Sequence, residues 1–321
     1  MIRNNEDGMP FTLYGTHPNR MHMSLQACDH AEVEPAVTGS SYVEFCLDFC
    51  DRNRIDVFIP RWNMYDIAKE VRRFEERGTK VMVCQDLSLL EKLIDKEKFY
   101  RSVEATGIMT LPDYQVVNTV EQFRAAYQQL IDKGHNVCIK PTKSEGGSGF
   151  RVIENGRDRV QDLFGPINKY MAFDEVVHLL EQVDRFDDLM VMELLEGYEY
   201  SIDCLADPAG KLIAAVPRRK AGGRLRALEQ NEEMLQIAKR VAETYKIPYN
   251  FNIQMKYNRG VPKLLEINPR MSGGLHVSCL SGVNFPYLAV KLILGMDVPT
   301  QEPTYGILAS HVEQPVHMKR F

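Results

Sequence analysis

The sequence predicts an α/β (α+β) protein: an N-terminal βαβ domain with a parallel sheet, followed by a two-part region with antiparallel sheets and a Gly-rich flap. Short apolar runs alternate with helical patterns over residues 1–90, which is typical of βαβ units. Further along, turn signals join strand-like runs into two hairpins, at 198–219 and 251–268. The small residues of SEGGSG (144–149) separate two more strand-like runs and predict the flap.

The N-terminal domain has three strand-like runs separated by helical patterns. In order these are FTLYG (11–15), a helix over 41–54, IDVFIP (55–60), a helix over 64–77 and KVMVC (80–84). A doubly wound domain usually opens with a strand, whereas this chain opens on the polar residues MIRNNEDGMP. We therefore expect the first domain to lack its opening strand.

The rest of the chain has longer helical patterns and paired strands. The expected helices cover 89–106, 119–133, 174–184, 229–245 and 284–295. The expected strands cover 114–117, 137–141, 150–153, 191–195, 198–207, 211–219 and the hairpin 251–268. The segment AGGRLRA (221–227) is predicted to be a loop.

Composition excludes several classes of protein. The 321 residues include 39 Lys and Arg against 44 Asp and Glu, which gives a net charge of −5. Hydrophobic residues make up 44%, so a disordered, collagen-like or coiled-coil chain is excluded. We expect no nucleic-acid partner, because phosphate contacts need a local excess of Lys and Arg. A local anion site remains compatible with this charge.

Cysteine usage and hydropathy predict the compartment. Seven cysteines are present without a C-x-x-C motif, and Cys46 and Cys50 lie in an apolar helical pattern that predicts core packing rather than a zinc site or disulfide. The N-terminus has no apolar signal-peptide region, and no run of 18 apolar residues occurs. We expect a soluble, cytoplasmic protein with no membrane partner.

The flap is the first candidate for binding chemistry. The preceding strand ends at Lys140, and glycines let backbone N–H groups approach an anion closely. The segment lacks the Walker pattern, and it leads into a strand rather than a helix, unlike a dinucleotide fingerprint. Taken alone, it is equally well explained as a mobile surface hairpin.

A second candidate lies in LLEINPR (264–270). Glu266 and Asn268 share one face of a strand, and Gln254 lies on the preceding antiparallel strand. Oxygen ligands in this arrangement suit Mg²⁺, and the guanidinium of Arg270 suits a phosphate or acyl-phosphate. A solvated strand end is the less favoured alternative, because LLEI is too apolar for a surface edge.

A third candidate is the connector in VMELLEGYEYSID, where Glu193 ends one strand and Glu199 begins the next. Backbone groups at such a connector usually hold adenine, and a carboxylate reaches the ribose hydroxyls. Viewed alone, these residues are better explained as two unrelated surface glutamates.

Together and in this order, the three segments resemble the ATP-grasp superfamily, in its carbamoyl-phosphate-synthase-like and biotin-carboxylase-like branch. The resemblance covers about residues 88–300. It implies four segments: an N-terminal pre-ATP-grasp βα domain (1–90), a central lid domain (91–190), a C-terminal catalytic domain (191–300) and a tail (301–321).

The resemblance also implies site residues. The nucleotide-binding set is Lys96, Lys140, Ser144, Gly146, Gly147, Ser148, Glu193, Leu195 and Glu199. The metal-binding set is Gln254, Glu266 and Asn268, and the catalytic set is Lys140, Asn268 and Arg270. Lys98, close to Lys96, is expected to face solvent. The family often has an acidic residue at the position of Gln254, so the number of metal ions stays open.

The acceptor pocket is less well defined. A basic cluster of Arg218, Arg219, Lys220 and Arg226 suits either a substrate carboxylate or a solvated loop. The substrate candidates are Arg219, Arg226, Ser272 and His276, although His276 is slightly better explained as a structural loop residue. Arg61 and Trp62 follow a strand end and are weaker candidates.

The activity that the resemblance implies is that of an ATP-dependent C–N ligase. Such enzymes use ATP with Mg²⁺ (or Mn²⁺) to activate a small-molecule carboxylate as an acyl-phosphate, which an amine then attacks. An amino-acid ligase is one form of this activity, and a homodimer is common in the family. Two alternatives remain: a carbamoyl-phosphate-synthase-like enzyme that makes a small phosphorylated product, and a non-catalytic nucleotide-binding scaffold.

Overall fold

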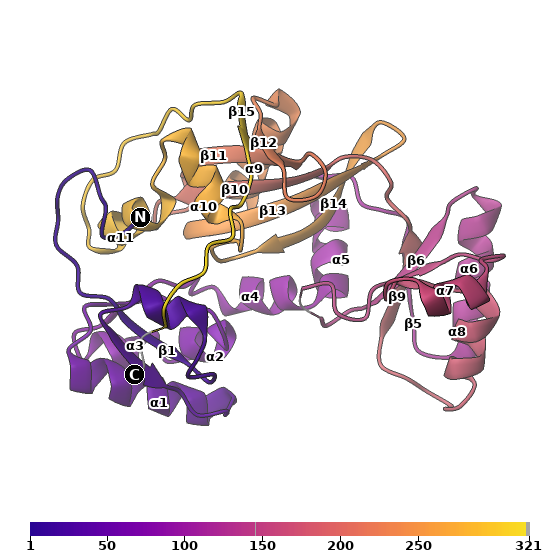
Figure 1. The fold of residues 1–321 in the computed structure, drawn as a ribbon, viewed down its shortest axis with the longest axis horizontal. Coiled ribbons are helices and arrows are strands. Elements are labelled where there is room, and N and C mark those ends of the chain that lie inside the picture. Colours follow the sequence, from indigo (N-terminus) through magenta and orange to yellow (C-terminus); the bar gives the residue numbers. More distant parts are fainter. Residues whose placement is uncertain (145, 319–321) are drawn as a thin grey trace. The chain divides into compact units, whose positions relative to one another are not determined.

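The computed structural model describes residues 1–144 and 146–318 (Figure 1). Glu145 of the predicted flap and residues 319–321 of the predicted tail lie outside the described residues. The chain forms two compact units. The first unit contains residues 1–91, 200–253 and those from 267 onward, and the second contains 92–199 and 254–266.

The N-terminal part of the first unit contains two parallel strand pairs. Its elements are β1 (Tyr14–His17), η1 (Met23–Ala27), β2 (His30–Val33), α1 (Gly39–Asn53), β3 (Val57–Phe58), α2 (Met64–Lys69), α3 (Val71–Glu75), β4 (Lys80–Val81) and α4 (Leu87–Ile94). β1 pairs with β2 and β3 pairs with β4, both in parallel. On α1, Cys46 and Cys50 are buried free thiols, which confirms their predicted place in the core.

The main sheet of the first unit has the strand order β14-β13-β10-β11-β12-β15. Its elements are β10 (Glu199–Ala206), β11 (Leu212–Lys220), β12 (Arg226–Leu228), α9 (Glu232–Tyr245), β13 (Tyr249–Asn258), β14 (Val261–Asn268), α10 (Leu275–Ser278), η2 (Cys279–Ser281), α11 (Phe285–Ile293) and β15 (Ile307–Ala309). β13 and β14 are joined by Arg259 and Gly260, both with positive φ, as a tight two-residue hairpin turn requires. The unit boundary falls within this hairpin.

One hydrophobic core joins distant segments of the first unit. Phe285, Leu288 and Val290 of α11 pack in it with Val216 of β11, and Met82 from the N-terminal segment belongs to the same core. The N-terminal segment is therefore packed against the residues around the main sheet rather than folded separately.

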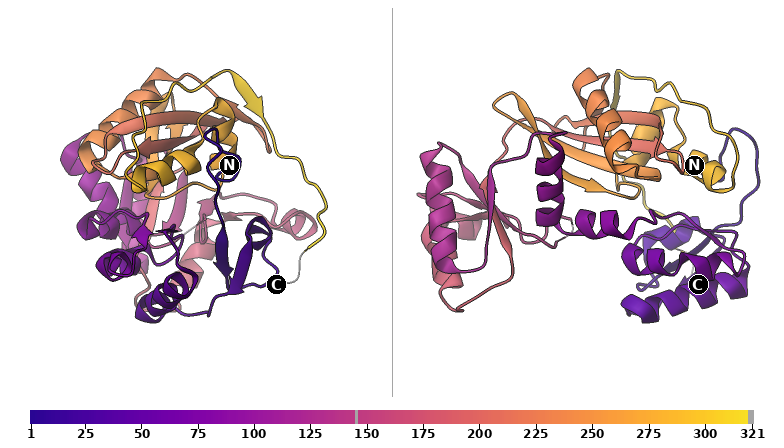
Figure 2. Two further views of the ribbon diagram at one scale, coloured as in Figure 1. Left: turned by 90° about the vertical axis from the view of Figure 1, so that its left-hand side faces the viewer. Right: turned by 180° about the vertical axis from the view of Figure 1, so that it is seen from behind.

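The second unit is a five-stranded sheet with order β5-β9-β6-β7-β8. Its elements are α5 (Lys96–Thr106), β5 (Tyr114–Val117), α6 (Val120–Asp132), β6 (Val137–Pro141), β7 (Arg151–Ile153), α7 (Arg159–Phe164), β8 (Tyr170–Met171), α8 (Phe173–Leu180) and β9 (Leu189–Glu193). α6 and α8 lie on one face of this sheet (Figures 1 and 2), and Phe123 and Val176 pack there with Val191. β6 and β7 are antiparallel, so residues 142–150 connect them as a hairpin.

The structure corrects several predicted elements. The helix expected over 89–106 is divided at Asp95, whose side chain accepts hydrogen bonds from the backbone N–H groups of Glu97 and Lys98 and so caps α5. The helix expected over 64–77 is likewise divided at Glu70. β12 begins within the predicted loop 221–227, and β15 lies within the predicted tail. Both depend on non-local pairing, which local patterns do not reveal.

The predicted mixed α/β architecture with parallel and antiparallel sheets is confirmed. The division into four consecutive segments and the missing opening strand stay predictions. Within the described residues, no helix is both long and apolar enough to cross a membrane.

Candidate functional site

Lys96 and the predicted flap come together in the second unit. The backbone N–H of Lys96 donates to the carbonyl of Thr142 at 3.2 Å, and its Nζ donates to the carbonyl of Ser144 at 2.5 Å. Lys96 is the first residue of α5, so the Asp95 cap fixes where its side chain begins. Lys98 is exposed, as predicted.

Lys140, on β6, lies in the same neighbourhood. Its Nζ is 5.4 Å from the centre of the Tyr100 ring, and it makes no hydrogen bond or ion pair with any described residue. Burial, together with the smaller effect of the positive charge of Lys96, lowers the pKa of Lys140 to about 8. Two ammonium groups thus share a site where the charge of Glu266 is close enough to oppose the lowering. An anion there would relieve their mutual repulsion.

Tyr100 holds α5 onto β14. It is fully buried, and its hydroxyl donates to the carbonyls of Leu264 at 2.9 Å and Leu265 at 3.1 Å. Burial raises the pKa of Tyr100, with the neighbouring carboxylate of Glu266 adding to the effect. The sequence reasoning missed this residue, because an apolar helix position gives no sign that its hydroxyl bridges to a distant strand.

The β6–β7 connection has a backbone that favours glycine. Gly146, Gly147 and Gly149 all have positive φ, between 61° and 78°. A Cβ on Gly149 would lie 2.7 Å from the ring of Pro141. This conformation lets successive N–H groups turn to one side, which is what phosphate binding requires. The predicted roles of Ser144, Gly146, Gly147 and Ser148 over phosphates stay predictions.

Glu193, at the end of β9, is fully buried and its side chain points into a charged network. One carboxylate oxygen forms an ion pair with Lys263, and the other is 3.0 Å from Nδ1 of His135. Nε2 of His135 is 2.9 Å from a carboxylate oxygen of Asp113. The predicted contact of Glu193 with adenine can therefore involve only its backbone.

Asp113, His135 and Glu193 also have the composition of a metal site, since one ligand atom from each lies within 4.8 Å of the others. Lys263 and Lys133 already supply positive charge to the two carboxylates. The arrangement therefore works as a charge network that ties β9 to the ends of neighbouring strands. Sequence reasoning missed the network, because its members are far apart in the chain.

The connector after β9 is tightly held. The N–H of Leu194 donates to the carbonyl of Asn136 at 2.6 Å, and Gly197 donates to that of Tyr257 at 2.9 Å. A Cβ on Gly197 would lie 2.8 Å from the same Tyr257 oxygen, so this close approach requires glycine. Leu195 is buried and Glu199 is half-buried.

The predicted metal ligands lie on neighbouring strands. Glu266 and Asn268 alternate along β14 and are both partly exposed, and Gln254 is partly exposed on β13. Carboxylate and amide oxygens are the ligands of a hard cation, so the donor set fits Mg²⁺.

The 269–274 loop, which connects β14 to α10, carries Arg270. Nη1 of Arg270 donates to the carbonyl of Met271 at 3.2 Å, and Nη1 of Arg61 donates to the same carbonyl at 3.3 Å. The structure thus brings the weak candidate Arg61 to the predicted phosphoryl site. Trp62 is exposed.

The basic cluster predicted around residues 218–226 does not act as one unit. Arg219 pairs with Glu229, and Arg226 donates to the carbonyls of Gly223 and Leu225. Arg218 is buried and forms an ion pair with Asp203. The sequence could not separate them, because which of two adjacent strand residues faces inward depends on the sheet.

The remaining substrate candidates lie beside Arg218. The hydroxyl of Ser272 accepts a hydrogen bond from Nη2 of Arg218 at 3.3 Å. His276 is exposed, with its ring centre 4.8 Å from that of His311. Partial burial lowers the pKa of His276, and the charges of His311 and Arg218 lower it further.

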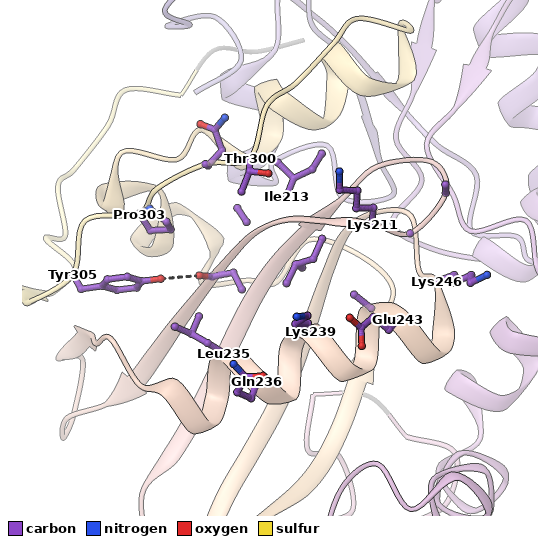
Figure 3. Close-up of a pocket in the computed structure, with 17 residues that line it drawn as sticks. Lys211, Ile213, Leu235, Gln236, Lys239, Glu243, Lys246, Thr300, Pro303 and Tyr305 are labelled. Carbon is purple, nitrogen blue, oxygen red and sulfur yellow. Dashed lines mark hydrogen bonds between the residues drawn. The ribbon is translucent and has the colours of Figure 1, made fainter.

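A separate pocket of about 710 Å³ lies in the first unit between β11, α9 and residues 300–305 (Figure 3). The apolar Ile213 and Leu235 line it, together with Lys211 and Lys239. None of the predicted site residues lines it.

The glycine-rich hairpin beside two lysines and the oxygen ligands on paired strands are the features on which the resemblance to the ATP-grasp superfamily rests. Residues 185–315 match a family described as "ATP-grasp in the biosynthetic pathway with Ter operon". The resemblance to the ATP-grasp superfamily, in its carbamoyl-phosphate-synthase-like branch, is confirmed.

Curated relatives include two arginine-specific carbamoyl phosphate synthase large chains. The chain is 22% identical over 305 residues to that of Geobacillus stearothermophilus and 21% identical over 333 residues to that of Bacillus subtilis. These matches cover 90% and 98% of this chain. The chain spans only 27% and 30% of the length of these relatives.

Solved structures share the fold. An N5-carboxyaminoimidazole ribonucleotide synthetase in complex with ADP superposes with a TM-score of 0.66 at 14% identity, over 92% of this chain and 74% of that one. The biotin carboxylase domain of Hydrogenobacter thermophilus 2-oxoglutarate carboxylase, with MgADP and bicarbonate, gives 0.65 at 16% identity, over 94% and 68%.

Proposed function

We propose that this protein is an ATP-dependent carboxylate–amine ligase. The observation that carries the proposal is the neighbourhood of Lys96, Lys140 and Glu266, where two ammonium groups lie beside the glycine-rich hairpin. Two partly desolvated ammonium groups that repel each other favour binding of an anion, and a triphosphate is an anion of the right charge. An amino acid is a candidate for one of the two substrates.

The reaction would proceed in two steps. A carboxylate oxygen of the substrate attacks the γ-phosphorus of ATP, the bond from that phosphorus to the bridging oxygen breaks, and ADP leaves. The nitrogen of the amine then attacks the acyl carbon, inorganic phosphate leaves, and the amine loses a proton to solvent. Positioning and charge neutralisation provide most of the catalysis in phosphoryl transfer.

Each predicted residue would contribute a simple task. Lys96 and Lys140 would neutralise the phosphates, and the N–H groups of Gly146 and Gly147 would enclose them and exclude water. The connector from Glu193 to Leu195 would meet adenine through its backbone, Glu199 would meet the ribose, and Arg270 with Asn268 would hold the transferred phosphoryl group. Gln254, Glu266 and Asn268 would hold Mg²⁺ or Mn²⁺, which when bound offsets phosphate charge.

The test is an ADP-release screen over amino acids and small carboxylates with an amine, followed by mass spectrometry of the products. ADP release that requires carboxylate, amine and Mg²⁺ together is the expected result. A Glu266→Gln variant should lose about 100-fold in rate, since a negatively charged ligand of the metal ion becomes neutral. Lys98→Met, at an exposed position close to Lys96, serves as a matched control. Full activity of Glu266→Gln would contradict the site assignment.

A second candidate function is that of a carbamoyl-phosphate-synthase-like enzyme. The curated relatives support it, although the chain spans less than a third of their length. Release of a phosphorylated small product without any amine acceptor would favour it. Tight ATP binding without turnover on any substrate would instead favour a nucleotide-binding scaffold. Sedimentation would test the expected homodimer.

A further inference from the structure

Arg218, on β11, is the centre of a buried polar network in the first unit. Its Nε donates to Asp203 at 3.3 Å and to the hydroxyl of Ser278 at 3.2 Å. Its Nη2 donates to Asp203 at 3.2 Å, to Ser201 at 3.0 Å and to Ser272 at 3.3 Å. These partners come from β10, from α10 and from the 269–274 loop. The guanidinium is therefore fixed in position and orientation.

Asp203 is held equally firmly. One of its carboxylate oxygens accepts from the hydroxyl of Ser278 at 2.5 Å, and the other accepts from the side-chain amide of Asn252 at 2.9 Å. Asp203, Asn252 and Ser278 are fully buried. Several hydrogen bonds thus hold the buried ion pair of Arg218 and Asp203, and they fix its geometry.

One nitrogen of Arg218 is left over. Nη1 donates to none of the residues that the structure describes, although a guanidinium has five N–H donors and the other two nitrogens are used. The side chain is 7% exposed, and it lies beside Gly274 and near the exposed His276. The network thus fixes Nε and Nη2 and leaves the N–H donors of Nη1 without a partner among the described residues.

Gly274 packs closely against the guanidinium of Arg218. A Cβ at Gly274 would lie 2.5 Å from Nη1 and 2.6 Å from Cζ and Nη2 of Arg218, so the guanidinium would have to move. A Cβ at Gly273, the preceding residue, would meet nothing within 4 Å. Neither glycine has the positive φ that would require glycine for backbone reasons. The absence of a side chain at 274 is thus explained by Arg218.

We propose that Nη1 of Arg218 binds the substrate carboxylate in the first unit, next to the loop that carries Arg270. This inference rests on the proposed ligase function. A single free nitrogen contacts one carboxylate oxygen and leaves the other available to attack the γ-phosphorus. A guanidinium free on two nitrogens would hold both oxygens and weaken the nucleophile. Because arginine stays protonated, the subsite keeps its charge across the physiological pH range.

Binding is tested without turnover, using the full chain and acetate as the probe. Saturation-transfer NMR measures acetate affinity, and acetamide, which has the same shape without the charge, is the control ligand. Gly274→Ala should weaken acetate binding about tenfold, as expected for loss of a hydrogen bond to a charged group. Gly273→Ala should change it less than about twofold, since its Cβ meets open space. Arg218→Lys, which keeps the charge but loses the fork, should also weaken it.

Unchanged acetate affinity in a folded Gly274→Ala variant, or equal binding of acetamide, would overturn the proposal. If Gly274→Ala and Arg218→Lys both lose their thermal transition, crystals of the unsubstituted chain are soaked in acetate instead. Acetate within hydrogen-bond distance of Nη1 of Arg218 supports the subsite, and acetate bound only elsewhere refutes it. The proposed function fails separately. ADP release that depends on a carboxylate but is unaffected by Gly274→Ala refutes only the subsite. Acetate at Nη1 without any turnover refutes only the ligase.

Discussion

Two cations, the buried Arg218 of the first unit and the half-buried Lys140 of the second, have opposite surroundings. Arg218 in the first unit has Asp203 and three hydroxyl groups around it. Lys140 in the second unit has an aromatic ring nearby, a second lysine whose charge repels it, and no hydrogen bond or ion pair with the described residues. The first cation is compensated by the protein, and the second is not.

The difference indicates that Lys140, rather than Arg218, is suited to a polyanionic ligand, whose negative charge would take the place of an ion-pair partner. A compensated guanidinium is rigid and stabilises its surroundings, so its remaining nitrogen can orient a single substrate carboxylate. An uncompensated ammonium is a cost in the free protein that a bound polyanion removes. Loss of the charge at Arg218 should therefore lower both the free energy of unfolding and the affinity for substrate. Loss of the charge at Lys140 should lower the affinity for nucleotide but raise the free energy of unfolding.

The largest effect is expected for Asp203→Ala. Removing one partner of a buried ion pair leaves an unpaired charge, which should lower the free energy of unfolding by about 3–5 kcal/mol. Denaturant unfolding followed by hydrogen exchange of β10 and β11 measures it. Asp297→Ala, at an exposed position in the same unit, should change stability by less than about 0.5 kcal/mol. Equal stability of the two variants would contradict the compensation of Arg218.

Lys140→Met should separate binding from stability. Nucleotide affinity should fall about 10- to 100-fold, because a charge-assisted contact is lost. The second unit should become more stable at pH 7, by on the order of 1–3 kcal/mol, because an uncompensated cation is removed. Titration with a fluorescent ATP analogue and thermal unfolding measure the two. A Lys140→Met variant that has both a lower affinity for nucleotide and a lower free energy of unfolding would refute this contrast between Lys140 and Arg218.

Nucleotide affinity should also depend on pH through Lys140. Its pKa of about 8 means that the free protein loses this charge as the pH rises above 8, so affinity should fall by up to about tenfold per pH unit there. Stability should change in the other direction. Between about 8 and the ordinary lysine value of 10.5, the unfolded chain binds more protons, so the free energy of unfolding rises with pH. A Lys140→Arg variant should show neither trend.

The smallest effect is expected for Tyr100→Phe. This change removes the hydroxyl that donates to two carbonyls of β14 and should cost about 1 kcal/mol, without altering the charge of the site. Chemical denaturation of the second unit measures it. Tyr65→Phe on α2, where the hydroxyl makes no hydrogen bond with the described residues, is the matched comparison. A loss equal in both variants would show that the bridge to β14 contributes nothing.

Local patterns predicted much of the fold. The strands at 114–117 and 137–141 agree with the structure residue for residue, because each is a short apolar run with clear ends. The division at Asp95 was missed, although Asp is a strong N-cap, because the apolar periodicity continues across it. β15 was missed because its strand character comes from pairing with β12, 80 residues away.

By itself, the sequence determined the order of the segments: a lysine at a strand end, a glycine-rich hairpin, a connector with glutamates, and a carboxylate and amide two residues apart. Glycine conformation and strand alternation depend on neighbouring residues, so they can be deduced from the chain alone. Only the tertiary structure decided which charges are compensated. Arg218 and Arg219 are adjacent in sequence, yet one is buried against Asp203 and the other pairs with Glu229 at the surface, because the sheet places alternate residues on opposite faces.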